Sequence, residues 1–287
     1  ALGEAGVLSG WVDGAKVLKL NADQSMPAAM DELAALSGRS AFALRFDSDY
    51  LEFAQVNRGQ KVTVDAKPLK DIANLPTDTA GFYSFGGGSD AVKQMWPILK
   101  KLAAGSGANV DAELKQVEQQ TGLVLPADLQ TLLGQQFDVV VAKQDFAELA
   151  GMPKVGVRMW TDTVKAQSIL DKLVTLATQA GGGSGPGFKL ATKATNGHLD
   201  VALDDSYRST LATAGNLSST AGFATVLPQL QTSVQAMYVN LDAIESQYLD
   251  QVPADYRELV KALQSVGMTS QPAKDGEQHS VLRLSVN

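Results

Sequence analysis

The sequence predicts an α+β protein with an extensive antiparallel or mixed β-sheet and helices packed mainly on one face of each sheet. Two kinds of pattern point to this fold class. Apolar and polar residues alternate in many short segments, whereas other segments place an apolar residue at every third or fourth position. These segments follow the same order twice along the 287 residues, which predicts two similar lobes that arose by internal duplication.

The alternating segments define the predicted strands. Phe42, Leu44 and Phe46 alternate with small or charged residues, and the acidic stretch 47–49 then reads as a turn. A second turn is expected at Asn196-Gly197, a typical hairpin pair. Other strands are expected at 16–20, 51–53, 81–85, 137–142, 154–160, 199–203, 235–241, 267–269 and 280–286. Because alternation indicates one buried face and one solvated face, it favours antiparallel pairing.

Helical periodicity marks four longer segments, at 26–33, 89–102, 162–179 and 256–263. Ser89 is the expected N-cap of the second of them, and Pro97 predicts a kink or break near Trp96. Shorter helices are expected at 67–74, 110–121, 126–133, 205–213 and 221–230. The stretch Gly181–Gly187 is rich in Gly and Ser and is expected to be a flexible loop.

The predicted duplication divides the chain into a first α+β half, residues 1–150, and a second α+β half, residues 151–287. Its best local echo is Pro126-Ala127-Asp128 against Pro253-Ala254-Asp255, each of which opens a predicted helix. The two halves could share one continuous sheet or face each other across a cleft, and both arrangements stay open at this stage. A cleft would favour a ligand site between the lobes.

Composition excludes several classes of function. The chain has 24 Lys+Arg, 31 Asp+Glu and no Cys, with a net charge of −7. The lack of Cys rules out disulfides, thiolate zinc sites and a Cys nucleophile, and the acidity argues against a nucleic-acid partner. We find no apolar run long enough to span a membrane. The chain begins at Ala1 without a Met or a leader pattern, so we expect a processed or truncated product.

The C-terminal third carries a resemblance to a known family. Ala236–Ile244 reads as a strand running into a helix, Leu263–Thr269 as a helix end, a Gly and a strand, and Ser280–Val286 as a closing strand; Leu132-Leu133-Gly134 leads into the strand Phe137–Ala142. These segments resemble a family of exported actinobacterial proteins that is known only as a domain of unknown function, with the resemblance strongest over residues 75–287. The resemblance implies an extracytoplasmic domain, tethered to the cell membrane by an N-terminal segment outside this chain. It implies no activity and no site residues.

Motifs that could carry chemistry are few. His198 and His279 are the two histidines, each expected as an exposed residue on a strand, although they could meet if their strands paired. The turn Gly86–Gly88 with Ser89 and Asp90 could bind an anion at a helix start, but it lacks the Lys of a phosphate loop, so we interpret it as a structural turn. Gly183-Ser184-Gly185 does not complete a nucleophile elbow, because Pro186 follows.

The acidic and aromatic residues also have structural interpretations. Asp47, Asp49 and Glu52 have part of a calcium-loop spacing but lack its Gly and last Glu, so we expect them in a hairpin turn. The pairs Asp204-Asp205 and Asp242/Glu245 are expected at helix starts. We expect Trp96 in the core, whereas Trp11 and Trp160 could also be surface anchors for a sugar or a protein partner.

These observations favour a non-catalytic binding or interaction domain of the bacterial cell envelope, whose partner could be an envelope protein or a lipid. No catalytic residue, cofactor or metal ligand is predicted. Two alternatives stay open. A carrier of a lipid or small hydrophobic ligand would need an apolar cavity, and a carboxylate-based hydrolase acting on envelope polymers would need two acids, such as Asp47, Asp242 or Glu245, to converge.

Overall fold

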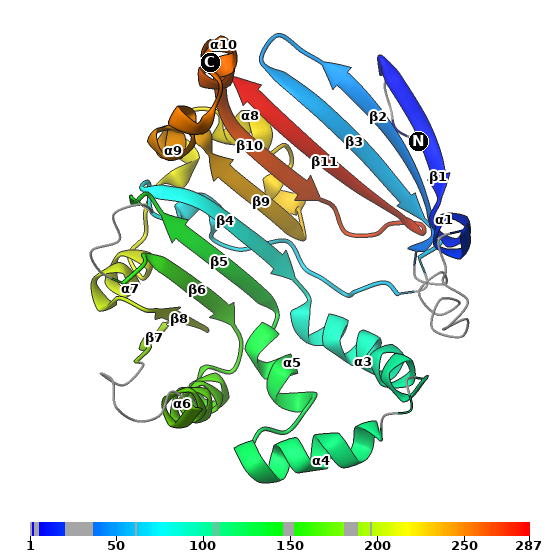
Figure 1. Ribbon diagram of the computed structural model, residues 1–287, viewed down its shortest axis with the longest axis vertical. Helices are drawn as coiled ribbons and strands as arrows, with labels where there is room; N and C mark the ends of the chain where they lie inside the picture. Colours follow the sequence, from blue (N-terminus) through cyan, green and yellow to red (C-terminus); the bar gives the residue numbers. More distant parts are fainter. Residues whose placement is uncertain are drawn as a thin grey trace.

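The computed structural model describes residues 2, 6–20, 37–60, 62–105, 107, 109–145, 152–180, 189–195 and 197–287. These residues form an α+β fold around one eleven-stranded sheet in the order β1-β2-β3-β11-β10-β9-β4-β5-β6-β8-β7. Every neighbouring pair of strands is antiparallel. The predicted fold class is therefore confirmed, and both halves of the chain contribute to one continuous sheet (Figure 1).

The strands are β1 Leu8–Asp13, β2 Arg39–Phe46, β3 Tyr50–Arg58, β4 Thr79–Gly86, β5 Gln136–Ala142, β6 Val155–Trp160, β7 Ala191–Thr195, β8 His198–Ala202, β9 Gln235–Asn240, β10 Leu263–Ser270 and β11 Glu277–Val286. The α-helices are α1 Gly14–Leu20, α3 Gly88–Gly105, α4 Val110–Thr121, α5 Ala127–Leu133, α6 Thr163–Ala180, α7 Asp205–Leu211, α8 Phe223–Val226, α9 Leu241–Tyr248 and α10 Ala254–Lys261. Short 3₁₀ helices are η1 Ile72–Asn74, η2 Leu217–Ser219, η3 Leu230–Thr232 and η4 Leu249–Gln251.

The strand order reads symmetrically from the centre of the sheet. On one side of the β9–β4 pair lie β10, β11, β3 and β2, with β1 beyond them at the edge, and on the other side lie β5, β6, β8 and β7. On each side, a central strand, β4 or β9, is followed along the chain by helices and then by two more strands, β5 and β6 or β10 and β11. Beyond these two strands in the sheet lies a hairpin, β8–β7 or β3–β2. The strands β2–β6 therefore occupy positions in the sheet that are equivalent to those of β7–β11. It fits a duplication, which stays a prediction, as does the division into residues 1–150 and 151–287.

Helices cover the sheet unequally. The main core lies where η1, α7, η2 and α8 pack on the centre of one face, against Phe82, Val140, Ala236 and Tyr238. A second core lies on the opposite face, where α6 and α5 pack on β6 and β8, and it includes Met159 and Leu199. In Figure 1 the helices α3 to α6 gather beside one end of the sheet, so much of the face in view has no helix on it.

Several local predictions were wrong. Residues 16–20 form helix α1 instead of a strand, because the Asp13 carboxylate accepts a hydrogen bond from the Lys16 amide at 3.2 Å and so caps a helical turn. Helix α3 is not broken at Pro97, and it begins at Gly88, one residue before the predicted N-cap Ser89. The expected helices at 67–74 and 221–230 shrink to η1 and to α8 with η3. The predicted helix at 26–33 and the Gly-rich loop at 181–187 lie outside the described residues.

Candidate functional site

Charge separates the two faces of the sheet. The strand registers place every charged side chain of the described strands on one face, which we call the charged face. These residues are Asp13, Arg39, Arg45, Glu52, Arg58, Asp138, Arg158, Lys193, Asp200, Glu277 and Arg283. The opposite face carries apolar and neutral polar side chains only, and we call it the uncharged face. The alternation of each strand therefore adds up to a sheet with one ionic surface and one uncharged surface.

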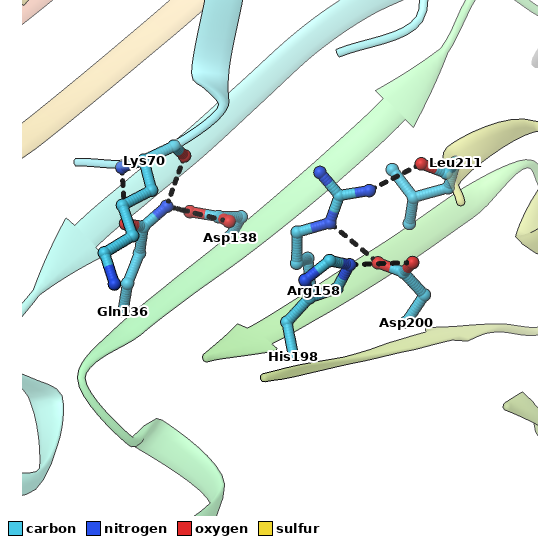
Figure 2. A network of polar contacts seen from close by, with 7 residues as sticks. All are labelled: Lys70, Gln136, Asp138, Arg158, His198, Asp200 and Leu211. Atoms are coloured by element: carbon cyan, nitrogen blue, oxygen red, sulfur yellow. Dashed lines mark hydrogen bonds and ion pairs between the residues drawn. The ribbon is translucent and has the colours of Figure 1, made fainter. Parts of the chain in front are cut away.

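A buried polar cluster occupies the charged face on β5, β6 and β8. Asp138, Arg158 and Asp200 stand opposite one another in register, in one row across three strands. The Arg158 guanidinium donates to the Asp200 carboxylate at 2.8 Å through Nε and to the Leu211 carbonyl at 2.6 Å (Figure 2). The side chains of Arg158 and Asp200 are only 8% and 0% exposed. This pairing offsets the cost of burying two charges beneath helix α7.

Asp138 accepts hydrogen bonds from a neutral side chain, Gln136. The Gln136 amide donates to both Asp138 carboxylate oxygens at 2.9 and 3.0 Å, and it also bonds to the backbone N–H and carbonyl of Lys70 at 2.7 and 3.0 Å (Figure 2). Burial raises the pKa of Asp138 to about 7, against the smaller opposing effects of Gln136, Ser84 and Arg158. The Asp138 carboxyl group therefore titrates near neutral pH, although the residue is only 1% exposed.

His198 extends this cluster. Its Nε2 lies 3.4 Å from the Asp200 carboxylate, and its ring lies 4.7 Å from the Trp160 ring. Burial lowers the pKa of His198, in spite of the nearby Asp200. Lys70 closes the cluster from outside, with Nζ 5.0 Å from the centre of the Trp160 ring. A His–Asp pair is a familiar catalytic element, but both side chains here are less than 10% exposed, so the pair has little contact with solvent.

A second row of charges occupies the equivalent place on the other side of the sheet. Arg283 on β11, Glu52 on β3 and Arg45 on β2 face one another in register. Glu52 accepts from Arg45 at 2.5 Å and from Arg283 at 2.8 Å, and Arg283 also lies 4.0 Å over the Tyr50 ring. This row borders two open pockets of about 560 and 730 Å³. It is therefore the more accessible of the two rows.

The uncharged face carries a broad apolar surface over β2, β3, β11, β10, β9 and β4. One row across these strands is formed by Leu44, Phe53, Leu282, Met268, Met237 and Tyr83. The next row is formed by Phe46, Leu51, Leu284, Val266, Val239 and Gly81. We call these two rows the apolar band. None of its side chains is buried, and Leu282 and Tyr83 are 38% and 39% exposed.

The strands β6 and β8 differ from those of the apolar band, because helix α6 covers their part of the uncharged face. Met159 on β6 and Leu199 on β8 also belong to the uncharged face, but they are 2% and 1% exposed beneath α6. Monomeric proteins rarely leave a contiguous apolar surface of several strands open to water, and such surfaces usually mark binding sites. The apolar band is thus the candidate functional surface of this chain.

The histidines predicted as exposed strand residues differ from each other. His279 on β11 has a side chain that is 47% exposed, 3.4 Å from Glu277, as predicted. His198 is buried in the cluster described above, so that prediction was wrong. The two do not meet, because β8 lies between β6 and β7 and β11 lies between β3 and β10.

The predicted turns and caps are partly confirmed. Asp204 accepts from the Tyr207 amide at 2.7 Å and caps α7, and Asp242 lies in the first turn of α9. Asp90, in the first turn of α3, accepts from the Asp65 amide at 2.9 Å. Asp47 and Asp49 lie between β2 and β3, but Glu52 lies inside β3, 5% exposed, so its prediction as a turn residue was wrong.

The three tryptophans lie in three different environments. Trp96 is half-buried in α3, and Trp160 packs at the end of β6 against His198. Trp11 stands on the edge strand β1 and is 71% exposed. Trp11 is therefore the most exposed of the three. The motif Gly183-Ser184-Gly185 lies outside the described residues.

Comparisons with known proteins add no assignment: no family model, no curated protein and no solved structure matches this chain. Within the described ranges, no group of three or more acidic or histidine side chains is placed to hold a metal ion. Those ranges also contain no helix that is both long and apolar enough to cross a bilayer.

Proposed function

We propose that this chain is a non-catalytic binding domain that takes up an apolar partner on the apolar band. The observation that carries the proposal is the separation of charge: the sheet hides part of its charged face under α7 and α8 and leaves the apolar band unburied, with Leu282 and Tyr83 38% and 39% exposed. A fold that needed this face only for its own core would cover it, as α6 covers Leu199. In line with the family resemblance, we propose that the domain works outside the cytoplasm, tethered to the membrane.

The hydrolase alternative has less support. Its acids would have to converge where a substrate can reach them, yet Asp47 and Asp242 border two different pockets. The two carboxylates that share a row across β5, β6 and β8, Asp138 and Asp200, lie on either side of Arg158 and are 1% and 0% exposed. General acid–base work requires contact with the substrate, and this burial prevents it.

The test is binding of an uncharged fluorescent dye, N-phenylnaphthylamine, to the purified chain. We expect saturable fluorescence enhancement that is reduced about tenfold or more in affinity by Leu282→Glu, because a carboxylate in the band would be desolvated by the dye. Leu259→Glu is the matched control: Leu259 is 67% exposed on α10, which contributes no residue to the band, and the variant has the same charge. Absence of saturable binding, or an equal effect of both variants, would contradict the proposed function.

A further inference from the structure

The edge strand β1 leaves one side of its backbone open. Among the described strands it pairs with β2 alone, at the end of the sheet (Figure 1). The next pair in the β1–β2 register is Gly14 and Gly38, and the Gly14 amide donates to the Gly38 carbonyl at 3.1 Å. Residues that bond to the partner alternate with residues that point away along an antiparallel strand. The outward backbone groups of β1 therefore belong to Ser9 and Trp11.

β1 also lacks the features that normally keep sheet edges from pairing. Natural edge strands carry Lys or Pro, contain a bulge or are very short. β1 has six residues, with neither Lys nor Pro among them, and its register with β2 has no bulge. Leu8 and Trp11 are 59% and 71% exposed. The opposite edge strand, β7, has five residues and carries the exposed Lys193, so it is better protected.

The outward amides and carbonyls select a polypeptide strand as the occupant of this edge. Only another strand repeats donors and acceptors at the same two-residue spacing, about 6.8 Å. A lipid chain or a saccharide has no such repeat. The chemistry of the edge therefore differs from that of the apolar band, where side chains alone face the solvent.

β1 is complementary to itself when two copies pair antiparallel about a two-fold axis at Gly10. This register places Ser9 opposite Trp11 of the second copy, so the outward residues of each copy exchange backbone hydrogen bonds. It also places Leu8 opposite Val12 of the second copy, which forms two apolar cross-strand pairs on the uncharged face. The two Trp11 side chains become diagonal neighbours on the charged face, within reach of each other.

The two-fold arrangement also closes. Pairing of β1 with β7 of another copy would leave a free edge at each end, and such contacts repeat into fibres. Pairing of β1 with β1 uses the same edge of both copies and ends there. Because opposite residues of antiparallel strands point to the same side, the uncharged faces of both copies lie on one side of the joined sheet.

We propose that this chain forms a two-fold dimer in which β1 pairs antiparallel with β1 of a second copy. The dimer goes beyond the proposed function, because β1 contributes no residue to the apolar band. One pair of six-residue strands buries little surface compared with a standard protein interface. The dimer therefore dissociates on dilution.

Sedimentation over a range of protein concentrations measures the mass in solution. We expect the mass to rise from one copy to two. Ser9→Pro should raise the dissociation constant of the dimer about tenfold or more, because proline has no N–H to donate to the second copy. Ser9→Thr is the matched control, since it changes the same side chain, keeps the N–H and should dimerise as before. A chain that is monomeric at every concentration, or a dimer that Ser9→Pro leaves intact, overturns the proposal.

Disulfide crosslinking tests the register, and it decides the question if Ser9→Pro does not fold. The chain has no Cys, so Leu8→Cys and Val12→Cys each introduce a single thiol. Opposite residues of a pair that shares no hydrogen bonds lie about 4.5 Å apart at Cα, which a disulfide can bridge. On oxidation we expect crosslinked dimers in a mixture of the two variants and far fewer in either variant alone. Equal crosslinking in all three samples, or none in the mixture, contradicts the proposed pairing.

Discussion

Arg158 on β6 and Arg283 on β11 occupy equivalent positions on the charged face. Each stands opposite an acid on the next strand outward, Asp200 or Glu52. Each acid in turn stands opposite a basic residue on the outermost strand of its hairpin, Lys193 on β7 or Arg45 on β2. The same order of arginine, acid and base thus recurs at symmetric places in the strand order. The two rows differ in cover, because the Arg158 row lies under α7 and the Arg283 row borders open pockets.

That difference predicts unequal costs for losing either arginine. Arg158→Met leaves Asp200 charged and 0% exposed, so it should lower the free energy of unfolding by about 3–5 kcal/mol. Arg283→Met should cost clearly less, because Glu52 keeps Arg45 at 2.5 Å. Urea unfolding measures both losses. The double variant Arg158→Met/Asp200→Leu should recover most of the stability, and equal losses for the two single variants would show that cover does not set the cost.

Asp138 predicts a pH dependence of stability. Burial raises its pKa from 3.8 to about 7 in the folded state, so between these values the folded chain binds a proton that the unfolded chain has released. The contribution of Asp138 to stability is therefore full below about pH 4, falls as the pH rises, and levels off above about pH 7. Asp138→Asn should remove this slope. Urea unfolding of both proteins between pH 5 and 8 checks it, and an unchanged slope in the variant would contradict the assignment.

The cap of α7 predicts a difference between two adjacent acids. Asp204→Ala removes the acceptor of the Tyr207 amide and should cost about 1 kcal/mol. Asp205→Ala removes a 76% exposed carboxylate that pairs with Arg208, and it should cost less than about 0.5 kcal/mol. Thermal unfolding of the two variants provides the comparison. A larger loss for Asp205→Ala would show that the cap does not stabilise α7.

Substitutions on the uncharged face should lower the free energy of unfolding by different amounts, depending on whether a helix covers the substituted residue. Leu199→Ala, beneath α6 and 1% exposed, should cost about 2–5 kcal/mol through the cavity that it leaves. Leu282→Ala, in the apolar band and 38% exposed, should cost under about 1 kcal/mol. Chemical denaturation measures both. A large loss at Leu282 would mean that the band belongs to the core, and the case for a binding surface would weaken.

Much of this fold could be predicted from local patterns, and the reasons are physical. Alternation of apolar and polar residues reports strands such as β2 and β8 directly, and Asp204 reports the start of α7. The strand at 16–20 was wrongly predicted because Asp13 caps a helix there, a contact that apolar periodicity does not report. Helix α3 continues through Pro97 because tertiary context overrides local propensity.

The candidate site could not be predicted in the same way. Arg158 and Asp200 each stand in the middle of an alternating strand, where a charged residue normally indicates the solvated face. Only the strand order brings them together and buries them under α7. The charges do keep one parity within each strand, such as Arg45 against Leu44. That parity signals two chemically different faces, but which face stays open depends on where helices such as α6 pack.

The most direct test of the central claim uses the lack of natural Cys in this chain. Leu282→Cys places a single thiol in the apolar band, and Leu259→Cys places one on α10; each is labelled with a polarity-sensitive fluorophore that is excited where N-phenylnaphthylamine does not absorb. When N-phenylnaphthylamine is added, we expect a saturable blue shift of the label at 282 and no shift at 259. No shift at 282, or equal shifts at both sites, would contradict the claim that the apolar band is the binding surface of this protein.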